Sequence, residues 1–437
     1  MDSVDTLIDA KWVIPVEPEG LVLDDHSVAV KDGNILAVLP TSDARLRYDP
    51  LRRVSLPHHA LIPGLVNLHT HASMSLMRGL ADDMPLMTWL TRHIWPAETA
   101  HISGQFVYDG TRLACAEMLL GGVTCFNEMY FFPEQAARAA LAAGMRAAIG
   151  IITIELPTAY ASDADDYLSK GLAARDQFAQ QPLLSFCMAP HAPYTVADRS
   201  FGRVLMLADE LDLPIHIHLH ETLDEIDQGV TQHGVRPLER LYKLGLVGPR
   251  LVAVHSVHMD EAELDLLAGA GASVAHCPSS NLKLASGIAP VGRMLERGIN
   301  VGIGTDGAAS NNSLDMFREM RTAALLAKVG AGNAETMPAA RALRAATLNG
   351  AAALGLADRI GSIVAGKSAD LCAVAFDAPG MQPCYDPISH LVYAAGRENV
   401  SHVWVDGTLR VEDRQLSGFD RMDLDKIVQL WQNNFAK

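Results

Sequence analysis

The middle of the chain, from about residue 60 to 360, alternates short apolar segments with Ala- and Leu-rich segments of helical pattern. Eight apolar segments begin near Leu61, Gly122, Met145, Leu184, Pro214, Leu251, Ala272 and Asn300. Helical patterns lie between them, for example at 108–120, 134–143, 200–211, 236–244 and 260–269. This alternation predicts an α/β fold, a (β/α)8 TIM-type barrel over 60–360. In such a barrel the chemistry takes place at the C-terminal ends of the strands.

Polar residues follow these apolar segments at the point where the predicted strands end. The segment ends are His69-Thr70-His71, Phe126-Asn127-Glu128, His191, His216 to Glu221, His255, His276 and Asp306. Residues i and i+2 of a strand point to one face, so His69 and His71 can reach the same ion. Histidines scattered through a core would not gather at one end of the strands, so the pattern indicates a functional site.

These residue types suit a centre with one metal ion. His69, His71, one histidine of the fifth segment and Asp306 offer imidazole and carboxylate ligands, which zinc and ferrous iron accept better than magnesium or calcium. Such a centre keeps one position for a water molecule, whose pKa the metal lowers. Asp306 can accept a proton from that water while it binds the metal.

Glu221 and His255 are the candidates for proton transfer beside the metal. Glu221 lies just beyond the fifth segment and could carry a proton to a substrate. His255 could orient the water or donate to a developing alkoxide. Spacing alone leaves open which of His216, His218 and His220 binds the metal, because all three share one face of the strand.

The two ends of the chain predict a second, smaller unit. Hairpin patterns around Asp32-Gly33 and Asp406-Gly407 place β-rich runs near both ends. We expect 1–59 and 361–420 to form one composite β-sandwich domain. Residues 421–437 carry apolar side chains at helical spacing, so we expect a C-terminal helix that docks on the body.

Composition limits the partners and the compartment. The formal net charge is −16 and basic residues form no run, which argues against a nucleic-acid partner. The N-terminal segment lacks the pattern of a signal peptide, and no stretch is apolar over the length of a membrane span. The six scattered cysteines are typical of free thiols in a reducing compartment. We expect a cytoplasmic protein without a membrane partner, and a homodimer or homotetramer.

Four motifs, PGLVNLHTH, HLHET, VHSVH and GTDGAASNNSLDMF, occur in this order and resemble those of the amidohydrolase superfamily. More narrowly, they are similar to its mononuclear-metal aminohydrolases. That branch includes the methylthioadenosine/S-adenosylhomocysteine deaminases, guanine deaminase and the triazine hydrolases. The resemblance covers nearly the whole chain. It implies a hydrolytic deaminase with one Zn²⁺ per subunit, with Fe²⁺ as the alternative.

The resemblance also implies roles for single residues. The family's metal-binding histidine stands three residues before the acid/base glutamate, which makes His218 the ligand and Glu221 the proton shuttle. His255 matches the catalytic histidine beside the metal, and His258 is then structural. No lysine follows the fourth segment, so a two-metal hydrolase of the dihydroorotase type is disfavoured.

For the adenosine-type deaminases of this branch, the resemblance implies that Glu98 binds the ribose hydroxyls, Trp89 covers the nucleoside and His191 contacts the base. A carboxylate suits a diol because each oxygen can accept one hydroxyl. Members that act on S-adenosylhomocysteine are expected to hold its carboxylate with arginines near the third strand. Residues 153–170 contain no arginine, and only Arg146 lies near.

The loop at 82–90 contains two methionines, two leucines and a tryptophan, which suit a methylthio group. We therefore predict hydrolytic deamination of 5'-methylthioadenosine at C6 to 5'-methylthioinosine and ammonia, with Glu221 binding and protonating N1. The alternative substrates are S-adenosylhomocysteine, adenosine, 5'-deoxyadenosine, guanine or a triazine. A non-catalytic metal-binding barrel is the alternative from another class, and the complete set of ligands together with Glu221 argues against it.

Overall fold

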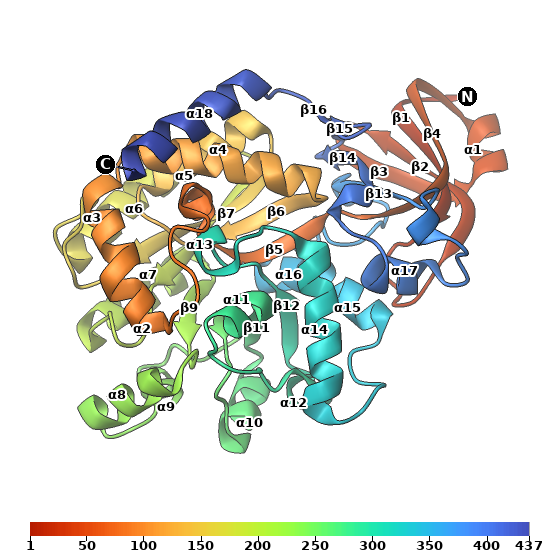
Figure 1. Cartoon of the computed structure of the whole chain (residues 1–437). Helices are drawn as coiled ribbons and strands as arrows, with labels where there is room; N and C mark the ends of the chain where they lie inside the picture. The colour runs from red at the N-terminus through yellow and green to blue at the C-terminus, as the bar shows by residue number, and fades with distance from the viewer. Residues whose placement is uncertain (437) are drawn as a thin grey trace.

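The computed structural model describes residues 1–436, which form a barrel and a second sheet beside it (Figure 1). Eight strands form the barrel sheet, and adjacent strands run parallel. In sheet order they are β5 (Leu65–Thr70), β6 (Val123–Glu128), β7 (Arg146–Thr153), β8 (Leu184–Pro190), β9 (Ile215–Leu219), β10 (Leu251–His255), β11 (Ser273–His276) and β12 (Asn300–Ile303). The predicted (β/α)8 fold is confirmed.

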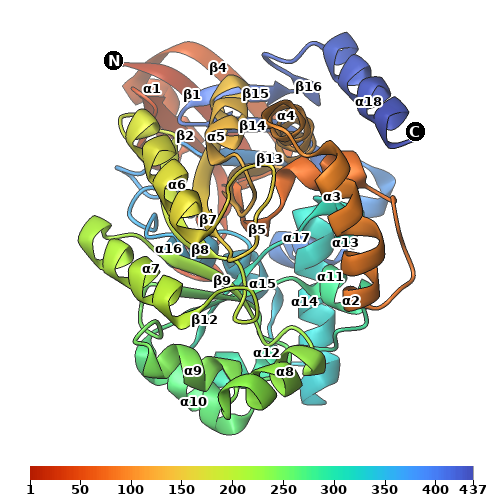
Figure 2. The same ribbon diagram turned by 90° about the vertical axis from the view of Figure 1, so that its left-hand side faces the viewer.

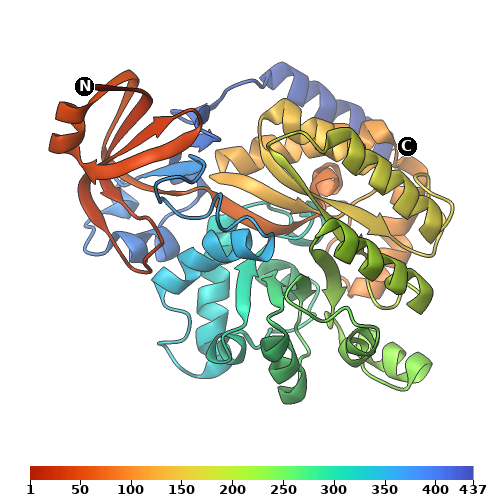
Figure 3. The same ribbon diagram turned by 180° about the vertical axis from the view of Figure 1, so that it is seen from behind.

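Helices surround the barrel and cover the outer face of its sheet (Figures 1 and 3). The main ones are α4 (Gly104–Leu120), α5 (Pro133–Ala143), α6 (Ala164–Phe178), α7 (Asp198–Leu211), α8 (Leu223–His233), α9 (Pro237–Lys243), α10 (Glu261–Ala270), α14 (Met316–Ala331), α15 (Ala339–Ala345) and α16 (Leu348–Ala353). Polar side chains cap the N-termini of some of these helices. Asp260 and Glu263 form a capping box at α10, and Thr222 caps α8 directly after the fifth barrel strand.

The barrel closes where β12 meets β5. Asp306 donates its backbone N–H to the carbonyl of His69 at 2.9 Å. Asn67 holds Thr305 twice, because its amide donates to the hydroxyl at 2.8 Å and its oxygen accepts the backbone N–H at 2.9 Å. Gly302 permits this approach, since a Cβ there would lie 2.5 Å from Leu68 Cδ2. The seam brings the ends of the first and last strands together.

The first apolar segment serves two sheets, which differs from the prediction. Leu61 lies in β4 (Tyr48–Pro63) of the second sheet, and the barrel strand begins at Leu65. Pro63 and Gly64 separate the two strands. A side chain at Gly64 would place its Cβ 2.1 Å from Thr124 Oγ1, so only glycine lets the chain turn into the barrel here.

The second sheet combines strands from both chain ends, which lie side by side in Figure 3. Its order is β16 (Gln415–Leu416), β15 (Thr408–Glu412), β14 (Val400–Val405), β13 (Leu371–Ala375), β4, β1 (Asp2–Val13), β2 (Leu23–Lys31) and β3 (Asn34–Pro40). Both predicted hairpins are present, with positive φ at Asp32-Gly33 and Asp406-Gly407. The domain limits at 59/60 and 360/361 stay predictions, and β4 continues across the first of them.

The C-terminal helix α18 (Arg421–Phe435) lies along α4 and α3 (Trp95–His101), as Figures 1 and 2 show. Trp431 is buried and donates its indole N–H to Asp109 Oδ2 at 3.0 Å. The Phe435 ring packs 4.5 Å from the ring of His101. Among residues 1–436, no helix has the length and apolar character that crossing a membrane requires.

Candidate active site

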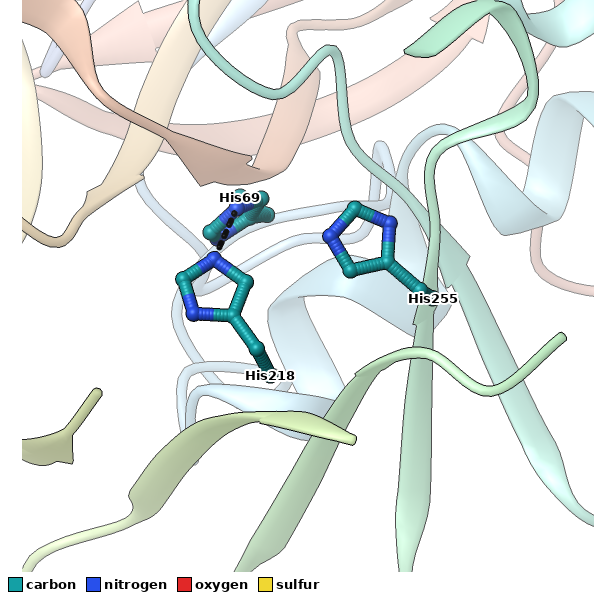
Figure 4. A group of neighbouring side chains, drawn as sticks. All are labelled: His69, His218 and His255. Atoms are coloured by element: carbon teal, nitrogen blue, oxygen red, sulfur yellow. Dashed lines mark hydrogen bonds between the residues drawn. The ribbon is translucent and has the colours of Figure 1, made fainter. Parts of the chain in front are cut away.

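Four side chains converge at the C-terminal end of the barrel. Nε2 of His69 and Nε2 of His71 each lie 3.3 Å from Asp306 Oδ1, and Nε2 of His69 lies 3.2 Å from Nε2 of His218. In Figure 4 the rings of His218 and His255 turn toward His69. Zinc–nitrogen bonds of about 2.0–2.1 Å in a tetrahedral site place neighbouring donors about 3.4 Å apart. These three distances are those of neighbouring ligands on one divalent metal ion, and His69 belongs to both candidate groups of donors, one with His71 and Asp306 and one with His218 and His255.

The far sides of these side chains fix their chemical form. Nδ1 of His71 lies 2.5 Å from the Met129 carbonyl, and Nδ1 of His218 lies 2.8 Å from the His191 carbonyl. A carbonyl only accepts, so each Nδ1 donates and each Nε2 keeps a lone pair for a metal. Burial also lowers the pKa of His69 to about 4, which keeps that ring neutral.

The carboxylate of Asp306 is held by donors on both oxygens. Ser280 and Ser310 donate their hydroxyls to Oδ2 at 2.6 and 2.8 Å, and the N–H of Gly307 donates to Oδ1 at 2.7 Å. These hydrogen bonds stabilise the ionised form, which is the form that binds a metal. Asp306 has a φ of 63°, a left-handed backbone conformation that is uncommon outside glycine.

His216 and His218 of β9 and His220, which follows this strand directly, have different surroundings. His218 alone of the three has its Nε2 among the metal donors. The Nε2 of His216 lies 3.0 Å from Nδ1 of His69, behind the site. His220 accepts the backbone N–H of Leu238 at 3.1 Å. The geometry thus favours the assignment of His218 that the family resemblance implied.

Glu221 and His255 lie together beside the metal donors. The Glu221 Oε2 and His255 Nε2 atoms are 3.7 Å apart. Burial raises the pKa of Glu221 to about 7, so the carboxyl can both give and take a proton near neutral pH. On its far side His255 has Nδ1 2.8 Å from Asn281 Oδ1. Nδ1 therefore donates to this oxygen, and the Nε2 atom is the one that faces Glu221.

A cavity of about 560 Å³ opens over these groups. Its walls include the metal donors His71, His218 and Asp306, together with Glu221 and His255. All three predicted nucleoside contacts, Glu98, Trp89 and His191, also line it. Its volume lies in the range of small-molecule sites, about 300–1,000 Å³. Every predicted site residue is thus part of one cavity or buried directly beneath it.

The predicted nucleoside contacts are anchored on their far sides. Glu98 accepts the Tyr130 hydroxyl at 2.6 Å, and burial raises its pKa to about 7. Trp89 is buried and donates its indole N–H to the carbonyl of Ala81 at 3.1 Å, so its ring is left to face the cavity. Nδ1 of His191 lies 3.1 Å from the hydroxyl of Thr195.

Among residues 1–436, no lysine or arginine lines the cavity, so this part of its wall carries no positive charge from either residue type. Arg146 stands at the start of β7, at the opposite end of the barrel strands. Its guanidinium pairs with Asp370 at 2.9 Å and reaches Asp406 at 3.3 Å. Arg146 therefore joins the barrel to the second sheet and does not contact the cavity.

Several residues that the sequence did not single out hold the site in place. They are Tyr130, Asn281, Ser280 and Ser310, which fix Glu98, His255 and Asp306. Ser310 lies within the GTDGAASN motif, and Ser280-Asn281 follow the seventh strand by four residues, so their position in the chain was a usable signal. Tyr130 had no such signal, because its partner lies 32 residues earlier.

Comparison with known proteins places this chain among hydrolases of the same architecture. The family model described as amidohydrolase family matches residues 60–410. A 5-methylthioadenosine/S-adenosylhomocysteine deaminase of Saccharophagus degradans is 46% identical over 428 residues, covering 98% of this chain and 96% of that protein. One of the same name from Teredinibacter turnerae is 45% identical over 434 residues, covering 99% and 98%.

Among solved structures, an adenosine deaminase from Xanthomonas campestris with bound zinc superimposes with a TM-score of 0.98. It is 52% identical, and the match covers 100% of this chain and 99% of that one. The match of the family model, the relatives that align over nearly their full length and the shared fold agree. The chain belongs to the amidohydrolase family.

Proposed function

We propose that this protein is a zinc-dependent deaminase that hydrolyses an adenosine derivative at C6, with 5'-methylthioadenosine as its preferred substrate. The observation that most supports this proposal is a single cavity that connects the metal site and Glu221 to Glu98. Among the residues that the structure describes, no lysine or arginine lines this cavity. The names of the relatives support the reaction type, and the zinc bound by the Xanthomonas campestris protein supports the choice of metal.

The chain's own residues suggest how the reaction proceeds. His69, His71, His218 and Asp306 would hold the metal, which supplies Lewis-acid activation of water. Glu221 then takes a proton from the attacking water and delivers it to N1 of the purine, which its pKa of about 7 suits.

The remaining polar groups would position the water and the nucleoside. The Nε2 of His255 would hydrogen-bond the attacking water, while Asn281 holds the ring through Nδ1. Glu98 accepts the two ribose hydroxyls, and His191 contacts the base from the end of β8. The second proton of the water would pass by way of Asp306 to the leaving amino group, so that ammonia and 5'-methylthioinosine are the products.

The cavity wall supports the choice of the 5' substituent. Leu86 and Trp89 of α2 (Leu86–Trp89) and Ile154 and Leu156 in the segment after β7 line it. A thioether is a soft, apolar group that packs well against such side chains. The amino-acid carboxylate of S-adenosylhomocysteine would enter the same region without a charged partner, which is costly when the carboxylate loses water.

Glu221→Gln tests the mechanism. The amide cannot shuttle a proton, so ammonia release from 5'-methylthioadenosine should fall by at least about a thousandfold. Metal content should stay at the wild-type level, because the proposed ligands are untouched. Glu210→Gln, the same exchange on the exposed face of α7, is the matched control and should leave turnover unchanged. An active Glu221→Gln enzyme would remove Glu221 from the mechanism.

A further inference from the structure

Tyr130 connects the metal site to the carboxylate of Glu98. It lies two residues after β6 and is buried, with 4% of its surface exposed. Its hydroxyl donates to Glu98 Oε1 at 2.6 Å, and both side chains line the cavity. Among the described residues, this hydroxyl is the single hydrogen-bond donor to the carboxylate, so the second oxygen is left for a ligand.

The preceding two residues tie the same segment to the metal donors. Glu128 accepts the hydroxyl of Thr70 at 2.6 Å and the backbone N–H of Ala72 at 2.8 Å. The carbonyl of Met129 faces Nδ1 of His71 at 2.5 Å. Three consecutive residues, 128 to 130, therefore fix both the end of β5 and the side chain of Glu98.

The charge of Glu98 makes this contact important. Burial raises its pKa to about 7, and the hydrogen bond from Tyr130 acts in the opposite direction. No lysine or arginine lines the described cavity to stabilise the anion. An ionised carboxylate can accept hydrogen bonds from two hydroxyls, whereas a protonated one uses one oxygen as a donor. Tyr130 thus favours the form of Glu98 that can accept a diol.

We propose that Tyr130 is a positioning residue for ribose recognition, which holds the Glu98 carboxylate in the orientation that accepts the 2'- and 3'-hydroxyls together. This inference rests on the proposed function, since it assigns the ribose of the nucleoside to Glu98. It extends that function by making recognition of the sugar depend on a residue that does not itself touch the reacting atoms.

The test compares two ligands on Tyr130→Phe. Binding is measured by calorimetry in the metal-loaded Glu221→Gln background, which needs no turnover. The ligands are 5'-methylthioadenosine and its 2',3'-dideoxy analogue. Loss of a hydrogen bond to a charged group should weaken binding of the ribonucleoside about tenfold. Binding of the dideoxy analogue should change by less than about twofold, because it has no diol to present to Glu98.

Two further variants keep the comparison specific. Tyr160→Phe removes another buried tyrosine hydroxyl, one without a hydrogen-bond partner among the described residues, and should leave both affinities unchanged. In a Glu98→Gln background, Tyr130→Phe should add no further loss. In the enzyme with Glu221 restored, Tyr130→Phe should raise KM for 5'-methylthioadenosine and leave kcat within about twofold.

Equal weakening of both ligands, or no weakening of either, would overturn the role of Tyr130. Additive losses of affinity when Tyr130→Phe and Glu98→Gln are combined would overturn it as well. If the wild-type enzyme releases no ammonia from any adenine nucleoside, the proposed function fails. The binding comparison still decides the inference about Tyr130 in that case, because it depends on the sugar and not on turnover.

Discussion

At the scale of single residues, the site contains two carboxyl groups whose pKa is raised because they have lost water. Glu98 and Glu221 both have a pKa raised to about 7, and the largest cause for each is the loss of water around the charge. In the proposed mechanism, Glu221 uses this property to exchange a proton. The proposed role of Glu98 has the opposite requirement, because a carboxylate must be ionised to accept both hydroxyls of a diol.

Nucleoside binding should therefore depend on pH through Glu98. A carboxyl with a pKa of about 7 is about 10% ionised at pH 6 and about 90% at pH 8. Affinity for 5'-methylthioadenosine should rise several-fold over that range, since only the ionised form accepts both hydroxyls. Calorimetry in the Glu221→Gln background checks this without the titration of Glu221 itself.

Glu98→Gln is the control for this pH dependence. Its affinity should be lower and flat between pH 6 and pH 8, because the amide does not titrate. Tyr130→Phe should move the midpoint to higher pH, since the lost hydrogen bond stabilised the anion. A wild-type affinity that stays constant across the range, or falls as the pH rises, would contradict the assignment of Glu98.

The sequence was sufficient to predict the site residues whose arrangement follows from their spacing along a strand. His69 and His71 are two positions apart at the end of a predicted strand, although β5 itself ends at Thr70, and Asp306 ends the last predicted strand. Pairs formed across the fold could not be predicted in this way. Tyr130 meets Glu98 only after β6 and α3 are packed, and no local pattern encodes that meeting.

At the scale of elements, the eight apolar segments predicted the strands because each is buried on both faces in a parallel sheet. Periodicity could not locate the break at Pro63-Gly64, since both neighbouring strands are apolar. It also could not predict the left-handed backbone at His255 and Asp306, with φ of 67° and 63°. Such conformations cost energy, and here they aim two site residues at the cavity.

The C-terminal helix shows how a surface element reaches the site indirectly. Its apolar spacing predicted that it docks, and Trp431 and Phe435 supply the contact. The packing against α3 places this helix directly behind the element that carries Glu98. The sequence does not show which surface this helix covers, because its contacts join residues that lie far apart in the chain, such as Trp431 and Asp109.

At the scale of the whole molecule, the barrel and the second sheet are joined by a buried ion pair. Arg146 and Asp370 expose 2% and 1% of their side chains, and Asp406 adds a third contact. The pair lies at the end of the barrel strands opposite the cavity. The expected assembly as a homodimer or homotetramer and the cytoplasmic location stay predictions.

Arg146→Met should destabilise the protein without changing its chemistry. Removing one partner leaves the Asp370 carboxylate buried and unpaired, which costs about 3–5 kcal/mol. The midpoint of urea unfolding should fall, while kcat/KM per folded, metal-loaded enzyme stays within about twofold. Arg138→Met, on the exposed face of α5, is the matched control. A selective loss of activity on S-adenosylhomocysteine would instead show that Arg146 acts on the substrate.

The proposed function requires the cavity to select an adenosine with a small apolar 5' group. The most direct measurement is ammonia release from the zinc-loaded enzyme, with kcat/KM compared for 5'-methylthioadenosine, adenosine and S-adenosylhomocysteine. We predict that 5'-methylthioadenosine is preferred over both, because the described cavity wall offers a thioether apolar contact and offers a carboxylate no cation. A preference for S-adenosylhomocysteine would contradict this account of the cavity, and no reaction with any of the three would contradict the assignment to nucleosides.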